Sequence, residues 1–155
     1  YISEILSISE SDANNYVAVY WGSMMVGRVI GYFGLQVIHP ARVLTFTSIA
    51  SIALILLSIS TDGMFAVWTM IAVGLCNSVM FAIIFSLAVE GLGEYTTQAS
   101  GLLSTAIAGG AIISYAQGVV IDNSTWQIAF LIPVVCYIYI VYYGISGYKS
   151  NQTIA

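Results

Sequence analysis

The stretch MFAVWTMIAVGLCNSVMFAIIFSLAV, residues 64–89, contains no charged side chain. A helix needs about 20 apolar residues to cross the hydrocarbon core of a bilayer, because each residue advances about 1.5 Å along the axis. The stretch exceeds that length and predicts a transmembrane helix. In the whole chain of 155 residues, 59% are hydrophobic and 6% are charged. A water-soluble domain has about 25% charged residues, so the composition predicts an integral membrane protein.

Apolar runs of this length recur along the chain. We expect each run to cross the membrane as a helix, and the runs cover residues 15–36, 43–60, 64–89, 98–121 and 126–147. The connections between them are short and polar. Short connections make consecutive helices antiparallel neighbours. The sequence therefore predicts an all-α, polytopic transmembrane helical bundle with five spans.

Basic residues lie towards one side of the predicted bundle. Arg28, His39 and Arg42 lie around the junction of the first two runs, and Lys149 follows the fifth. If the runs alternate in direction, these residues all lie on one side of the bilayer. Cytoplasmic connections carry the excess of Lys and Arg, so we expect a multi-pass protein of the cell membrane with a cytoplasmic C-terminus. Because the chain begins at Tyr1 without a basic leader, we expect it to be a fragment.

One amide and several rings are candidates for binding a polar solute. Asn77 lies in the middle of the third run, where a buried amide is costly unless it is hydrogen-bonded. It faces either an aqueous cavity and a polar solute, or a neighbouring helix through a bond of about 0.6–2 kcal/mol. Phe81 and Trp21 are aromatic rings of the kind that stack on sugars, or they only fill space. Ser104 and Thr105 raise the same question, although such hydroxyls also bond their own helix.

Glycines mark two helix faces for close packing. Gly27 and Gly31 are four residues apart, with Arg28 beside Gly27. Arg28 either bonds a neighbouring helix terminus or an acid, or only extends to the interface. Gly109 and Gly110 leave part of the surface of the fourth run without side chains. Such a surface either lets the helix slide against its partners or allows static close packing.

Several function classes have no support in the sequence. There is no Ser-His-Asp set, no HExxH, no P-loop and no pair of carboxylates within a run, so we expect no enzyme and no catalytic residue. A single histidine cannot build a His-based metal cluster, and we expect neither a metal nor a cofactor. A basic patch with interleaved aromatics is also absent, which argues against nucleic acid as a partner.

Two longer segments resemble a known transporter family. They are YWGSMMVGRVIGYF, residues 20–33, and AVGLCNSVMFAIIFSLAVEGLGEYTTQASGLLSTAIAGGAIISYAQGVVID, residues 72–122. They resemble the C-terminal half of the major facilitator superfamily, and within it the fucose permease and glucose/galactose transporter subfamily. The specific part is IFSLAxxGLG followed by T, SGLL, GGAI and QG. The resemblance implies that residues 1–155 form part of the C-terminal six-helix bundle, as helices 8–12 of a twelve-helix carrier, without helix 7 or the N-terminal bundle.

The resemblance also implies a function. It implies a secondary active transporter that carries a hexose, glucose/galactose- or fucose-like, by alternating access as an ion-coupled symporter. Fucose permease has a tyrosine where Phe81 stands, which favours a glucose/galactose-like sugar. The implied site residues are Asn77, Phe81, Trp21, Ser104 and Thr105 for the sugar, Gly27, Arg28 and Gly31 for the cytoplasmic gate, and Gly109 and Gly110 for helix packing.

The implied partners lie partly outside the chain. No carboxylate lies in the middle of a run, and the resemblance implies that the coupling acids belong to the missing N-terminal half. We therefore expect a proton or sodium to bind there as the coupling ion, unless the carrier is a uniporter. That half and the lipid bilayer are the expected partners besides the sugar. The alternatives are a major facilitator carrier for another small polar solute, or a membrane receptor or subunit that transports nothing.

Overall fold

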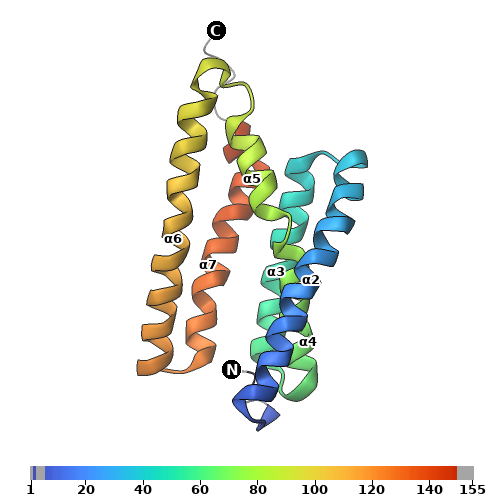
Figure 1. Cartoon of the computed structure of the whole chain (residues 1–155), viewed down its shortest axis with the longest axis vertical. Helices are drawn as coiled ribbons and strands as arrows, with labels where there is room; N and C mark the ends of the chain where they lie inside the picture. The colour runs from blue at the N-terminus through green and yellow to red at the C-terminus, as the bar shows by residue number, and fades with distance from the viewer. Residues whose placement is uncertain (1, 3–5, 150–155) are drawn as a thin grey trace.

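The computed structural model describes residue 2 and residues 6–149, and in this part of the chain it contains helices and no strand. The helices are α2 (Glu10–Val37), α3 (Pro40–Ser60), α4 (Gly63–Asn77), α5 (Met80–Val89), α6 (Thr96–Asn123) and α7 (Trp126–Ile145), with short 3-10 helices η1 (Gly93–Tyr95) and η2 (Gly147–Lys149). Consecutive long helices run in opposite directions (Figure 1). The predicted all-α bundle is confirmed.

Four segments are long and apolar enough to cross a membrane: α3, α4 with α5, η1 with α6, and α7. The protein is therefore an integral, multi-pass membrane protein. Helix α2 has 28 residues, about 42 Å at the usual rise, but it is less apolar than the other four. Arg28 and the two asparagines of its first turns lower its hydropathy. Its crossing of the membrane remains a prediction.

The third predicted span is interrupted in the structure. Residues 64–89 were expected to form one helix, but α4 ends at Asn77 and α5 begins at Met80. Val79 between them has φ −103° and ψ −15°. The Ser78 hydroxyl donates to the carbonyl oxygen of Leu75 at 2.8 Å, and a serine that bonds back to the preceding turn often bends a helix. The break places Asn77 at the end of a helix.

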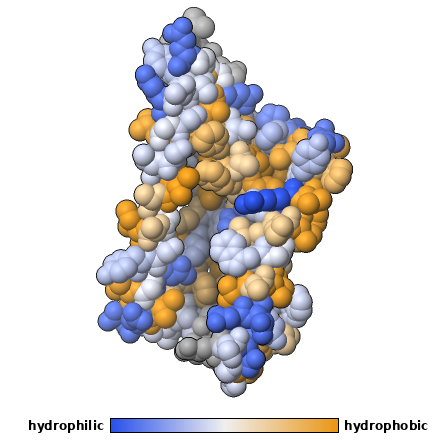
Figure 2. Space-filling model, in the orientation of Figure 1, coloured by the Kyte–Doolittle hydropathy of each residue, from blue (hydrophilic) through white to orange (hydrophobic). Residues whose placement is uncertain are grey.

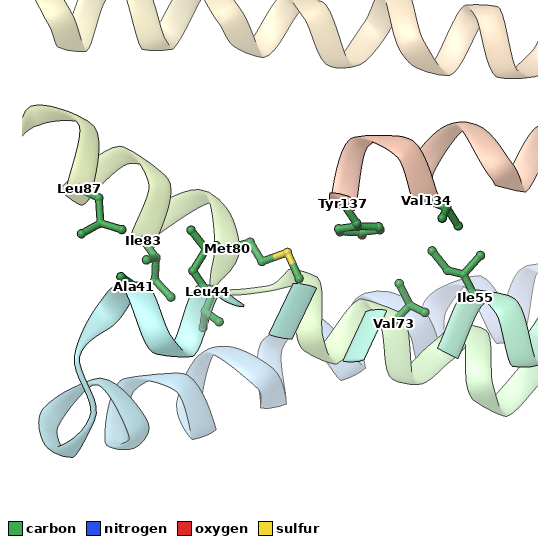
Figure 3. Close-up of a cluster of buried hydrophobic side chains, with 10 residues drawn as sticks. Ala41, Leu44, Ile55, Val73, Met80, Ile83, Leu87, Val134 and Tyr137 are labelled. Atoms are coloured by element: carbon green, nitrogen blue, oxygen red, sulfur yellow. The ribbon is translucent and has the colours of Figure 1, made fainter. Parts of the chain in front are cut away.

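Helix α3 is the centre of the packing. It contacts α4 and α7 extensively and α5 to a smaller extent, while α2 packs mainly on α4. Figure 3 shows side chains of α3 meeting those of α5 at one end of the core and those of α4 and α7 at the other. The buried cluster consists of Ala41, Leu44, Ile55, Val73, Val79, Met80, Ile83, Leu87, Val134 and Tyr137.

Small polar residues let α3 approach its neighbours. Ser48, Ser51 and Ser58 are fully buried on this helix. The Ser58 hydroxyl donates to the Ala66 carbonyl oxygen of α4 at 2.9 Å. Small side chains of this kind are enriched where membrane helices pack closely, because lipid supplies no hydrophobic force between helices.

Helix α6 lies at the side of the bundle, against α7 and α5 (Figure 1). None of its residues is buried within the described part of the chain. Figure 2 shows hydrophilic residues towards the two ends of the molecule and also at mid-height on the side that carries α2, with hydrophobic residues around them and a surface hollowed between α6 and that side. Nearly the whole circumference of α6 is therefore available to other partners.

Candidate functional site

The contact between α2 and α4 is built on residues without side-chain bulk. A Cβ added to Gly74 would lie 2.6 Å from Cε2 and 2.8 Å from Cδ2 of Tyr20. The ring of Tyr20 therefore rests directly on the backbone of α4. Beside it, the Ser23 hydroxyl lies 3.0 Å from the carbonyl oxygen of Ile71 in α4 and 2.7 Å from that of Tyr20. These contacts fix the two helices against each other next to Asn77.

Asn77 is half-buried at the end of α4, about one turn after Gly74, on whose backbone the Tyr20 ring of α2 rests. An asparagine amide has an oxygen that accepts and an NH2 that donates, so Asn77 has the capacity to bond a neighbouring helix or a solute. Both interpretations of Asn77 stay predictions.

The two candidate aromatic rings are both largely exposed. Trp21 is 63% exposed and Phe81 is 55% exposed. Trp21 stands edge-on to Tyr20, with ring centroids 6.2 Å apart, and Phe81 lies 6.1 Å from Phe85. Phe81 follows Asn77 across the break between α4 and α5. The structure therefore places a half-buried amide and two exposed rings on adjoining segments.

The candidate gate residues of α2 divide between two faces. A Cβ on Gly27 would meet the carbonyl oxygen of Leu75 and Oγ of Ser78, and one on Gly31 would meet Cγ1 of Val79. Both glycines therefore pack on the break between α4 and α5. Arg28 is exposed, and no ion pair of its guanidinium occurs among the residues that the structure describes.

Trp21 and Arg28 share a second face of α2. They are separated by two helical turns, since a helix advances about 100° per residue, and both are exposed. Met25 and Tyr32 share this face, so it mixes a charged residue with apolar and aromatic ones.

The candidates on α6 stand apart from Asn77. Ser104 and Thr105 are exposed, and their hydroxyls donate to the carbonyl oxygens of Ser100 at 2.8 Å and Leu102 at 2.7 Å. A Cβ on Gly109 or Gly110 would meet no atom within 4 Å in the described part of the chain. Any close partner of this smooth face has to come from outside these residues.

Some contacts were not foreseen from the sequence. Gly74 receives the Tyr20 ring, and Gly144 of α7 lies against Thr45 of α3, whose Oγ1 would be 2.6 Å from an added Cβ. His39 caps α3 by accepting a hydrogen bond from the Ala41 backbone N–H at Nδ1, 3.2 Å away. The sequence signal for the contacts of Gly74 and Gly144 is a glycine within an apolar run, which often marks a close approach of two membrane helices.

Comparison with known proteins gives several relatives. The chain is 44% identical over 146 residues to the glucose/galactose transporter of Brucella abortus (strain 9-941), a match that covers 94% of this chain and 35% of the relative. A putative glucose/galactose transporter of Helicobacter pylori (strain J99) is 40% identical over 154 residues, covering 96% and 38%. The L-fucose-proton symporter of Escherichia coli (strain K12) is 29% identical over 140 residues, covering 88% and 31%. The chain belongs to the fucose permease and glucose/galactose transporter family.

This family consists, by the names of these relatives, of transporters and symporters rather than enzymes. The chain spans 31–38% of the length of the three relatives. No family model matches the chain, and neither does any solved structure. The residues that the structure describes contain no group of three His, Cys, Asp or Glu placed to hold a metal ion.

Proposed function

We propose that the chain is part of a secondary active transporter that carries a hexose across the cell membrane by alternating access. The observation that supports this most is the 44% identity to a glucose/galactose transporter along 94% of the chain. The relatives named as L-fucose-proton symporters are less similar, at 25% and 29% identity. Glucose or galactose is therefore the favoured substrate.

The geometry around Asn77 suits a sugar. Its amide can hydrogen-bond a sugar hydroxyl, and the exposed rings of Trp21 and Phe81 can stack on the apolar face of the pyranose. The break after Asn77 adds backbone groups that no longer bond within a helix. Transporter sites near the bilayer midplane are often built on such discontinuous helices.

The remaining candidates belong to the same proposal in other roles. Ser104 and Thr105 would face the sugar from α6, on which Gly109 and Gly110 would admit a partner helix. Gly27 and Gly31 would let α2 close on the break, with Arg28 at the cytoplasmic end of the helix as part of the gate. In this proposal the segments are helices 8–12 of a twelve-helix carrier, and a N-terminal bundle faces them across the cavity.

Ion coupling is assigned to that other bundle. The acids of the later helices lie at helix ends: Glu90 caps α5, Glu94 is in η1 and Asp122 is near the end of α6. A group that carries a proton through the membrane has to lie along the path. A proton or sodium ion would therefore bind mainly outside this chain. Separately, the gathering of Lys and Arg on one side of the predicted spans supports a cytoplasmic C-terminus.

Uptake by the full-length carrier tests the proposal. Labelled glucose, galactose and fucose would be followed into vesicles with an imposed proton gradient, an imposed sodium gradient, or neither. We expect concentrative uptake of glucose or galactose with one of the two gradients, and a higher KM with Asn77→Ala at an unchanged amount of folded carrier. A folded carrier that concentrates none of the three sugars would refute the proposal and favour another solute or a receptor role.

A further inference from the structure

We propose that Ser51 and Tyr137 hold a buried water molecule between α3 and α7. This water is a structural ligand of the protein, and its site is separate from the one proposed for the sugar around Asn77. The inference goes beyond the proposed function and does not depend on it. The polar groups that carry it come from α3, α4 and α7.

Ser51 is the exception among the hydroxyl residues of α3. Its side chain is fully buried, and its Oγ has no hydrogen-bond partner among the residues that the structure describes. Thr45 Oγ1, by contrast, donates to the Ala41 carbonyl oxygen at 2.9 Å. Ser48 Oγ donates to the Leu44 carbonyl oxygen at 2.7 Å. Both bonds reach the carbonyl four residues back, as hydroxyls in helices often do, whereas the Ser51 hydroxyl makes no such bond.

A hydroxyl without a partner is costly at this depth. Ser51 lies in the middle of α3, a helix that is long and apolar enough to cross the membrane. Bulk water does not reach a buried group there, and burying a polar group without a hydrogen bond costs free energy. Buried polar groups are therefore usually bonded, either to the protein or to an ordered water.

Tyr137 of α7 lies opposite Ser51. The helices α3 and α7 run in opposite directions (Figure 1), and near one end Gly144 packs against Ala41 and Thr45. About two helical turns from this contact towards the middle of the bundle, α7 presents Tyr137 and α3 presents Ser51. An electrostatic interaction between the two side chains agrees with this placement.

The surface of α3 is recessed at this place. Its buried residues there are, in order, Leu44, Ser48, Ser51 and Ile55, so two small side chains stand between two large ones. Figure 3 shows Tyr137 over the interval between Leu44 and Ile55. Serines in place of aliphatic side chains leave room beneath the ring, and they line that room with hydroxyl groups.

The groups around the recess suit a water molecule. Tyr137 is buried, and no hydrogen bond of its hydroxyl occurs within the described part of the chain. Serine and tyrosine hydroxyls both donate and accept, so a water between them can bond both. Cys76 of α4 packs against the same cluster as Tyr137 and adds a weak third group. Buried waters make about three hydrogen bonds, whereas calcium or magnesium takes six or more oxygen ligands.

Hydroxyl-radical labelling of the purified full-length carrier tests the proposal. A short X-ray pulse converts water into radicals that oxidise the nearest side chains, so a trapped water marks the buried residues that bind it. Mass spectrometry then gives the oxidation rates of Tyr137 and Cys76 in the wild type and in Ser51→Ala. Ser58→Ala is the matched control, because Ser58 is equally buried on α3 but donates to a carbonyl oxygen of α4.

We expect Ser51→Ala to lower the oxidation rate of Tyr137 by about three- to tenfold, the effect of one hydrogen bond on the occupancy of the water. Ser58→Ala should leave that rate unchanged. Tyr137→Phe gives a second reading through Cys76, whose oxidation rate should fall in the same range.

Three results would overturn the inference. An unchanged or higher rate for Tyr137 in Ser51→Ala would show that Ser51 does not bind the water. Absence of Tyr137 oxidation in the wild type would show that no water lies there and that the two hydroxyls bond each other directly. Failure of both Ser51→Ala and Tyr137→Phe to fold would point to packing, because the loss of one bond to a water is too small to prevent folding.

Discussion

Replacing Gly27 with alanine should destabilise the carrier, whereas the same replacement at Gly34 in the same helix should not. A Cβ on Gly27 would meet the Leu75 carbonyl oxygen and Ser78 Oγ, and it would lie 3.1 Å from the Leu75 carbonyl carbon. A Cβ on Gly34 would meet no atom within 4 Å. The obstacle at Gly27 includes backbone, which cannot rotate away as a flexible side chain can. The helices would have to separate.

The expected difference is the sum of two terms. Alanine is better than glycine in a helix by about 0.5–1 kcal/mol, and this gain applies at both positions. Overfilling a packed interior costs about 1–3 kcal/mol, and a backbone obstacle places Gly27 at the upper end. Gly27→Ala should therefore destabilise by about 2 kcal/mol, and Gly34→Ala should stabilise by up to about 1 kcal/mol.

Gly31→Ala provides an internal check. The added Cβ would meet the side chain of Val79, which can shift. The unfolding free energy of Gly31→Ala should therefore lie between those of Gly27→Ala and Gly34→Ala. Adding Val79→Ala should recover part of it. The assay is the unfolding free energy of the purified full-length carrier, measured by SDS titration in mixed micelles. Equal unfolding free energies for Gly27→Ala and Gly34→Ala would refute the close approach of α2 to the break.

Three further predictions concern other contacts. Gly144→Ala should lower the unfolding free energy by about 1–2 kcal/mol, because Thr45 Oγ1 lies 2.6 Å from the added Cβ, and Thr45→Ala in the same chain should restore most of it; no recovery would contradict this packing. Ser58→Ala should cost about 0.6 kcal/mol in the same assay, the usual value of a hydrogen bond between membrane helices, and no measurable loss would show that the bond to α4 contributes nothing. Ser104→Ala and Thr105→Val should raise the KM for the hexose with unchanged stability, and an unchanged KM would remove both from the proposed site.

The positions of the helices could be predicted well because they depend on composition. The apolar runs match α2, α3, α6 and α7 to within a few residues of their observed bounds, whereas the run 64–89 is divided between α4 and α5. Ser9, which precedes the first run, caps α2, since its Oγ accepts a hydrogen bond from the backbone N–H of Asp12 at 3.3 Å. Asp62 and Thr125 occupy N-cap positions as well, but their side chains make no capping bond. Local patterns fix where a helix starts more reliably than how it is capped.

The break after Asn77 could not be predicted, because neither proline nor glycine marks it. Ser78 and Val79 are ordinary residues of membrane helices, and the bond from Ser78 to Leu75 is one of several conformations open to a serine. Spacing shows that Gly27 and Gly31 share a face, but it carries no information on which part of another helix meets that face.

The break between α4 and α5 also has a consequence for water. The first backbone N–H groups of α5 have no partner within that helix, and they lie within a segment that is apolar enough to cross the membrane. Elsewhere in such segments the amide hydrogens are locked in helical bonds and exchange slowly with solvent. At the break, isotope exchange should depend on whether solvent reaches the interior. The amides of residues 79–82 should therefore report, without any attached probe, how often this half of the carrier opens.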